Sequence, residues 1–226
     1  MAAATLVGCR SLLSPLLKPK LRFEPAAAVA HLRASDAVLS SLMDRVGPFA
    51  LALQRTNSLF EALLRSIVYQ QLHANAAGAI HGRVLAQLQR HGGATPEALA
   101  RASDAALRGA GLSRNKLLAI RDLAAKCLAG TVPSLREAHR LSDEELVARL
   151  TEVRGIGPWT VHMLLIFHLG RPDVMPTGDL AIRAGFRKLY RKRKDPHPEI
   201  VLKHARRWRP YRSVASWYLW RSLDSE

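Results

Sequence analysis

Apolar residues recur every three to four positions along most of the chain from about Asp36 onward. This is the spacing of a helix that buries one face against a core. Alternating apolar and polar positions bounded by turn residues, the pattern of strands, are absent from the sequence. The pattern therefore predicts an all-α protein with short connections between its helices.

Residues that favour helix starts precede several of these apolar stretches. Ser35 or Asp36 stands before a helix through Val46, and Asn57 stands before another through Val68. These side chains could accept the unpaired amides of the first helical turn. Further helix starts are expected near Ala76, at Thr95-Pro96-Glu97, at Ser113, at the capping box Ser142-Asp143-Glu144-Glu145 and at Pro158.

The charge of the chain narrows the choice of partner. Lys and Arg number 34 against 18 Asp and Glu, which gives a formal net charge of +16. So basic a chain favours a polyanionic partner through neutralisation of phosphates and release of their counterions. Composition alone leaves DNA, RNA and an acidic membrane surface open as that partner.

The cysteine count excludes several kinds of site. Cys9 and Cys127 are the only cysteines in the sequence. A disulfide scaffold and four-cysteine zinc or iron–sulfur sites are therefore excluded, and a reducing, intracellular compartment is expected. No apolar run approaches the ~18 residues that a membrane span requires.

The N-terminal stretch has a different composition from the rest. It is rich in Ala, Leu and Ser and carries no acidic residue before Glu24. An organellar transit peptide and a disordered basic tail both fit this composition. We expect residues 1–33 to be such a tail and residues 34–226 to form the folded domain. The expected location is the nucleus, with a chloroplast or mitochondrion as the alternative.

A glycine-bracketed turn lies between two expected helices. One helix should end near Leu150 and the next should begin at Pro158, with Gly155 and Gly157 between them. Glycines permit backbone angles closed to other residues and let a ligand approach closely. The free amides at the start of the second helix could then bind a phosphate oxygen without reading base identity. The turn therefore predicts a phosphate-binding hairpin.

Asp179 follows the helix that begins at the hairpin, at the expected start of another one. The ordinary interpretation of an aspartate at this position is a helix cap. A carboxylate at a positive helix end is also favoured in its ionised form. It could then stabilise a developing cationic sugar or orient an attacking water molecule.

The hairpin, the helix after it and the Pro-x-x-Asp-Leu segment resemble the helix-hairpin-helix DNA glycosylase superfamily. The closest resemblance is to the 3-methyladenine DNA glycosylase II (AlkA-like) family. It extends to the segments Ser66–Leu72 and Trp208–Arg221, so it covers roughly residues 34–223. It implies a two-lobed helical fold and Asp179 as the catalytic residue. The bacterial member has an additional N-terminal β-domain, for which we expect no room in this chain.

The same resemblance implies simple hydrolysis of the N-glycosidic bond. Bifunctional members carry a lysine two residues after the second glycine of the hairpin, which forms a Schiff base with the sugar. Here that position is Trp159. The missing cysteines also argue against the branches that hold an iron–sulfur cluster.

Trp159 and Trp220 match aromatic base-pocket positions of the family, and Met163 stands where the bacterial relative has a pocket tyrosine. An electron-rich indole face attracts a cationic alkylated base. Core packing is the alternative for both tryptophans, and it has more weight for Trp220. The departure at Met163 leaves the preferred base open, including 3-methyladenine, 7-methylguanine, hypoxanthine and ethenoadenine.

Leu72 matches the family's wedge, which fills the gap left by a flipped nucleotide. Taken alone, Leu72 would be read as a core residue. Gln71 beside it joins the expected DNA contacts, which are Gln71, Arg154, Gly155, Gly157 and Thr160.

Between Arg183 and Arg212 the chain carries twelve basic residues against Asp195 and Glu199. The run at residues 191–194 fits a nuclear localisation signal, a phosphate-contacting patch or a solvated loop. No cofactor is expected to be required. The resemblance implies a structural Na⁺ or K⁺ held by the backbone carbonyls of Thr151, Val153 and Ile156.

Two classes of function remain at this point. The favoured one is a monofunctional glycosylase for alkylated purines, acting as a monomer on damaged double-stranded DNA. A downstream abasic-site endonuclease would process its product. The alternatives are a non-catalytic helix-hairpin-helix module that only binds DNA, and a glycosylase for other damaged bases.

Overall fold

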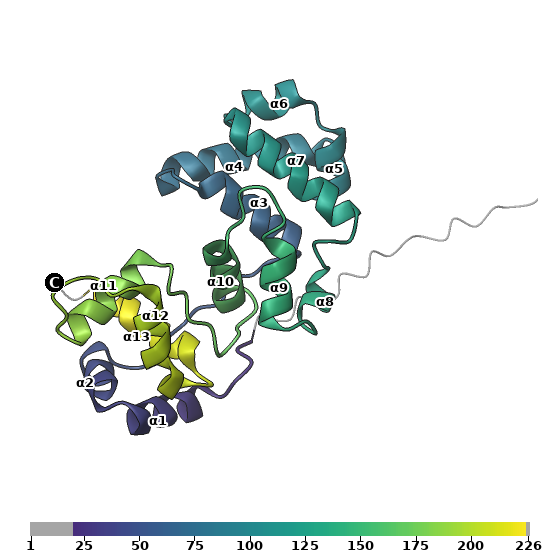
Figure 1. The fold of residues 1–226 in the computed structure, drawn as a ribbon. Helices are drawn as coiled ribbons and strands as arrows, with labels where there is room; N and C mark the ends of the chain where they lie inside the picture. Colours follow the sequence, from purple (N-terminus) through teal and green to yellow (C-terminus); the bar gives the residue numbers. More distant parts are fainter. Residues whose placement is uncertain (1–19, 225–226) are drawn as a thin grey trace, which may run out of the picture.

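The computed structural model describes residues 20–224, and this part of the chain is helical and contains no strand (Figure 1). No helix within this range is long and apolar enough to cross a membrane. The helices are α1 (Pro25–Ser35), α2 (Ala37–Val46), α3 (Leu59–Tyr69), α4 (Ala74–Gln89), α5 (Pro96–Arg101), α6 (Asp104–Gly109), α7 (Arg114–Leu128), α8 (Leu135–Ala138), α9 (Asp143–Leu150), α10 (Pro158–Phe167), α11 (Leu180–Leu189), α12 (Pro198–His204), η1 (Ala205–Trp208) and α13 (Arg212–Arg221).

The helices form two lobes with separate cores (Figure 1). The first lobe contains α3 to α10, and the second contains α1, α2 and α11 to α13. The chain passes from one core to the other between Val174 and Met175, which belong to different clusters of buried residues. The expectation of an all-α, two-lobed fold is confirmed.

Capping side chains account for most of the helix starts. Asp36, Thr95, Ser113 and Ser142 each accept backbone amides of the first turn, as expected. The cap expected at Asn57 is wrong by one position. Ser58 caps α3 instead, and the Asn57 amide group donates to the Glu61 carboxylate at 3.0 Å.

The expected boundary between tail and domain at residue 34 is also wrong. Residues 25–35 form α1, and Ala28 and Leu32 are fully buried in the second core. This helix was missed because it is rich in alanine, which favours helices strongly but gives a weak apolar pattern. The expected transit peptide or basic tail otherwise falls on residues 1–19, outside the described residues.

Candidate active site

The hairpin lies between α9 and α10 and has one position with a positive φ angle. Gly155 adopts φ +80°, in the region that favours glycine. Gly157 has φ −105° and ψ 172°, an extended conformation open to any residue, so the expectation of a special backbone angle there is wrong. A Cβ atom at Gly157 would meet no other atom within 4 Å. Gly157 therefore leaves open space in front of the helix start.

The first turn of α10 lacks a capping side chain, because its N-cap is Gly157 and its first residue is Pro158. The amides of Trp159 and Thr160 follow at the positive end of the helix. The Thr160 side chain is buried, so its expected contact with DNA would be made through the amide. The Arg154 amide is already used, since it donates to Asp122 Oδ2 at 2.7 Å.

A second turn, after α3, is tied to the hairpin. Gln70 Nε2 donates to the Gly155 carbonyl at 2.8 Å. Lys116 Nζ donates to the carbonyls of Val68 and Gln70, at 2.6 and 2.8 Å. The next residue, Gln71, has φ +56°.

Leu72 follows this turn with 40% of its surface exposed. The expected wedge is thus an exposed apolar side chain, and it is not part of the core. Its place next to a turn held by two neighbouring segments limits its freedom to move. Its role in filling the duplex remains a prediction.

Asp179 serves as a helix cap and also contacts the first lobe. Oδ1 accepts the Ile182 amide at 3.0 Å and so caps α11. Oδ2 accepts the indole Nε1–H of Trp159 at 2.6 Å. The two interpretations of Asp179, a cap and a site residue, are therefore compatible in one side chain. The Trp159 contact joins α10 of one lobe to the start of α11 in the other.

Trp159 also lines a cavity of about 990 Å³, whereas Asp179 is not among the residues of its wall. Trp159 and Met163 line it, as expected. Trp220 does not line it. The Trp220 ring packs against Phe167, with ring centroids 5.5 Å apart, and Phe167 is on the wall. Trp220 therefore contacts a residue of the wall without lining the cavity itself, and its expected contact with a base stays a prediction.

The cavity wall includes side chains that the sequence pattern did not single out. Arg65 lies over the Tyr69 ring, 3.8 Å from its centroid. Burial lowers the pKa of His168, the neighbouring Arg65 lowers it further, and a hydrogen bond with the Gln54 backbone acts against both. No acidic residue is among the lining side chains, which include the cations Arg65, Lys116 and Arg154.

Lys116 is the only lysine on this wall. Burial lowers its pKa, but its amine donates to two backbone carbonyls. It therefore has a structural use in holding the turn before Leu72. No spacing in the sequence could have indicated this, because its partners lie more than forty residues away in the chain.

The expected cation site is a set of turn carbonyls. Among them, the Val153 carbonyl accepts the Ile156 amide at 3.0 Å, which leaves it a second lone pair. In the described part of the chain, no group of three or more His, Cys, Asp or Glu side chains could hold a metal ion.

Comparison with known proteins gives a consistent family. Residues 64–210 match the family model of the HhH-GPD superfamily base excision DNA repair protein. DNA-3-methyladenine glycosylase 1 of Schizosaccharomyces pombe is 44% identical over 163 residues, which are 72% of this chain and 72% of that protein. Alkylbase DNA glycosidase-like protein mag2 of the same organism is 31% identical over 194 residues, 85% of this chain and 91% of that protein.

Two solved structures are similar as well. The Schizosaccharomyces pombe 3-methyladenine DNA glycosylase in complex with abasic DNA is 40% identical, with a TM-score of 0.74, covering 86% of this chain and 95% of that one. The Bacillus halodurans DNA-3-methyladenine glycosidase is 34% identical, with a TM-score of 0.80, covering 88% and 89%.

Proposed function

The chain belongs to the HhH-GPD superfamily of base excision DNA repair proteins, and from this membership we propose that it is a monofunctional glycosylase for alkylated purines such as 3-methyladenine. The observation that carries the proposal is the contact between Trp159 and Asp179 beside the cavity. We infer that this aromatic face and this carboxylate would act together on one flipped nucleotide.

The chemistry follows from the charges that develop. As the bond to the base breaks, the sugar becomes cationic, and the electron pair of the bond leaves with the base. The Asp179 carboxylate would stabilise that cation and orient the water that attacks it. A base alkylated at a ring nitrogen already carries positive charge, so it leaves without strong protonation by the enzyme.

Trp159 would contribute through its ring face. Its Nε1–H is used on Asp179, while 48% of the residue surface is exposed. The face can attract a cationic base. The Asp179 contact fixes the indole orientation, so the carboxylate and the ring would act on one substrate in a defined relative geometry.

Duplex binding would use the hairpin and the turn before Leu72. Amides at the start of α10 would bind a phosphate, and Leu72 would fill the gap in the stack. Gln70 joins the two turns, so the phosphate bound at the hairpin and the gap filled by Leu72 would lie at a fixed distance from each other. The structural relative that holds abasic DNA supports duplex DNA as the partner.

The absence of lyase activity rests on two lysine observations. Trp159 occupies the position of the Schiff-base lysine of bifunctional relatives. The Lys116 amine, whose pKa is lowered by burial, donates to two backbone carbonyls and so holds the turn before Leu72. Borohydride treatment during reaction with damaged duplex should trap no covalent complex. A trapped complex lost in Lys116→Met would overturn the monofunctional assignment.

The remaining parts of the proposal are a monomeric state, location in the nucleus and a cation at the hairpin carbonyls. The alternative location is a chloroplast or mitochondrion. A downstream abasic-site endonuclease would take up the product, because hydrolysis leaves an abasic site with the strand intact.

Excision measured on a panel of duplexes tests the function itself. The panel contains 3-methyladenine, 7-methylguanine, hypoxanthine or ethenoadenine at one position, with an undamaged duplex as control. We expect release of the methylated purines and none from the undamaged duplex. Duplex binding without release of any of these bases would favour a non-catalytic DNA-binding module.

A further inference from the structure

The connection from α10 to α11 crosses between the lobes, and residues 171–175, which we call the strap, are its central part. The strap contains no helix. Its two ends are held by different lobes. It therefore links the first lobe, with Trp159, to the second lobe, with Asp179, as does the connection from α2 to α3.

Arg171 fixes the strap to the first lobe. Its guanidinium donates to the carbonyls of Leu141 and Ala138, at 2.7 and 2.9 Å. It also pairs with Asp143 at 3.3 Å, at the start of α9. Because α9 leads directly into the hairpin, Arg171 anchors the strap to the helix that carries it.

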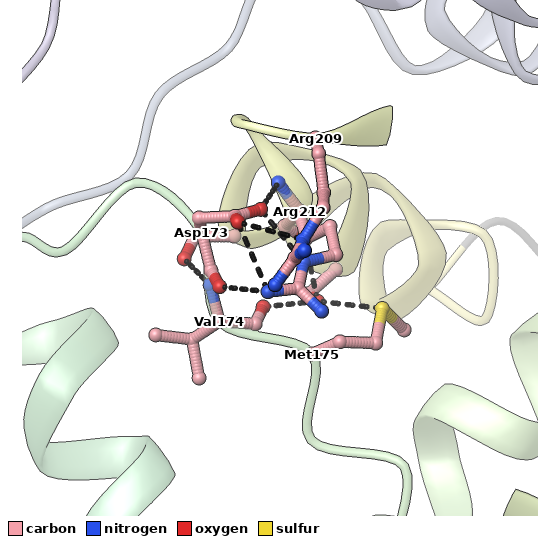
Figure 2. A network of polar contacts seen from close by, with 7 residues as sticks. Asp173, Val174, Met175, Arg209 and Arg212 are labelled. Atoms are coloured by element: carbon pink, nitrogen blue, oxygen red, sulfur yellow. Dashed lines mark hydrogen bonds and ion pairs between the residues drawn. The ribbon is translucent and has the colours of Figure 1, made fainter. Parts of the chain in front are cut away.

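Asp173 fixes the strap to the second lobe (Figure 2). Its two carboxylate oxygens take the Arg212 guanidinium in a two-pronged contact, at 2.7 and 2.9 Å. Arg212 also donates to the Asp173 carbonyl at 2.8 Å, and Arg209 adds an ion pair at 3.3 Å. Paired contacts of this kind restrict orientation more than a single ion pair does.

The strap backbone is held at the same place. The Ser213 amide donates to the Pro172 carbonyl, and the Val174 amide donates to Ser213 Oγ, both at 2.9 Å. Ser216 Oγ lies 3.3 Å from the Val174 carbonyl. The start of α13 therefore binds the strap through side chains and backbone together.

Only a short turn separates this anchor from Asp179. The Thr177 amide donates to the Met175 carbonyl, and the Asp179 amide donates to the Pro176 carbonyl, both at 2.9 Å. A displacement of the strap would pass through these turns to the start of α11. The Trp159–Asp179 contact spans the same lobe boundary that the strap crosses.

We propose that Asp173 is a positioning residue, which sets the distance between Asp179 and Trp159 by clamping the strap to Arg212. The inference rests on the proposed catalytic role of Asp179. Asp173 itself touches no substrate. Its effect would be on the rate of the chemical step, since a shift of about 1 Å in a reacting group can cost about 100-fold in rate.

The experiment compares Asp173→Asn, Arg212→Gln and the double variant with the unchanged protein. Single-turnover excision of 3-methyladenine should fall by about 100-fold in each single variant. Duplex affinity should stay within a few-fold, because the phosphate contacts are elsewhere. The double variant should be no slower than the slower single one, since both remove one shared contact.

A second readout does not depend on activity. The chain has four tryptophans, so the Trp159 indole resonance can be assigned in a ¹H–¹⁵N spectrum by Trp159→Phe. Loss of the Asp179 contact should move this resonance in Asp173→Asn. Asp173→Glu, which keeps the carboxylate, should restore part of both the rate and the resonance position.

Asp36→Asn is the matched control, because Asp36 is a buried carboxylate of the same lobe without contact to the strap. It should lower the free energy of unfolding. The position of the Trp159 resonance should not change, and the excision rate of the folded protein should stay within a few-fold. An equal loss of rate in Asp36→Asn, or an unmoved resonance in Asp173→Asn, would overturn the proposal. If the unchanged protein excises none of the bases, the proposed function fails, while the resonance still decides the positioning claim.

Discussion

Asp36 and Asp179 make the same two kinds of hydrogen bond but lie in different surroundings. Each caps a helix with Oδ1, and each accepts a tryptophan indole N–H with Oδ2. Asp36 is 5% exposed, and its Oδ2 also lies within 2.9 Å of Tyr190 Oη and His204 Nε2. Among the described residues, Asp179 Oδ2 accepts a hydrogen bond only from Trp159, and Asp179 is half-buried.

The difference shows what separates a structural carboxylate from a reactive one. An ionised carboxylate offers about four lone-pair sites. At Asp36 five donors surround the group, so nothing remains for a substrate. At Asp179 two donors hold the group in place and leave acceptor capacity for a sugar cation or a water molecule.

The largest effect is expected from Asp179→Asn. Excision of 3-methyladenine under single-turnover conditions should fall by about 1000-fold, because the charge that stabilises the cationic sugar is gone. Stability should change by less than about 1 kcal/mol, since asparagine is an equally good cap. Rate and urea unfolding measured on one preparation check this. A fully active variant would remove Asp179 from the mechanism.

Asp36→Ala should show the opposite pattern. Its buried partners lose their acceptor, so the free energy of unfolding should fall by about 3 kcal/mol. Urea denaturation measures the loss, and excision at a temperature where the variant is folded should remain within a few-fold. A large loss of excision rate without a loss of stability would contradict the assignment of Asp36 as a purely structural carboxylate.

Trp159→Phe sharpens the comparison at Asp179. It keeps an aromatic face but removes the donor to Oδ2, so the excision rate should fall about tenfold, the size of one hydrogen bond to a charged group. The effect should be found in the rate at saturating enzyme and only weakly in duplex affinity. If neither the excision rate nor the duplex affinity changed, the indole contact would have no role in excision.

The smallest effect is expected in the pH dependence of stability. Burial acts to raise the pKa of Asp36, but hydrogen bonds from Tyr190, His204, Leu39 and Trp208 outweigh it and hold the pKa below its ordinary value of 3.8. The unfolded chain then takes up the proton first, so this contribution is present above that value and declines as the pH falls below it.

Thermal melts between neutral and acid pH measure this decline. In a plot of melting temperature against pH, Asp36→Asn should decline less steeply than the unchanged protein at pH values below the ordinary pKa of a carboxyl group. Burial also lowers the pKa of His204, against its hydrogen bond to the Asp36 carboxylate, which raises it, so protonation of His204 acts in the same direction. An identical acid limb in both proteins would contradict the assigned contribution of Asp36.

The sequence predicted both aspartates as helix caps but could not separate their roles. The caps are local, since each side chain meets an amide two or three residues ahead. Their surroundings are not local, because Tyr190, His204 and Trp208 lie more than 150 residues from Asp36. Only the family resemblance distinguished Asp179.

Contacts between distant parts of the chain also explain why the position of Trp220 and the start of the folded domain were not predicted correctly. Trp220 matched a pocket position, but its ring packs against Phe167, and of these two residues only Phe167 lines the cavity. The alanine-rich α1 gave no strong apolar pattern, although Ala28 and Leu32 are fully buried. Helix periodicity shows that a face is buried but does not show which partner covers it.

Binding of two abasic-site analogues tests the role of Asp179 most directly. One duplex carries a neutral tetrahydrofuran, and the other carries a pyrrolidine whose ring nitrogen is cationic, like the sugar in the transition state. The unchanged protein should bind the cationic duplex at least about tenfold more tightly, through a charge-assisted contact with Asp179. Asp179→Asn should lose this preference while it still binds the neutral duplex. An equal preference in both proteins would show that the carboxylate does not stabilise the sugar cation.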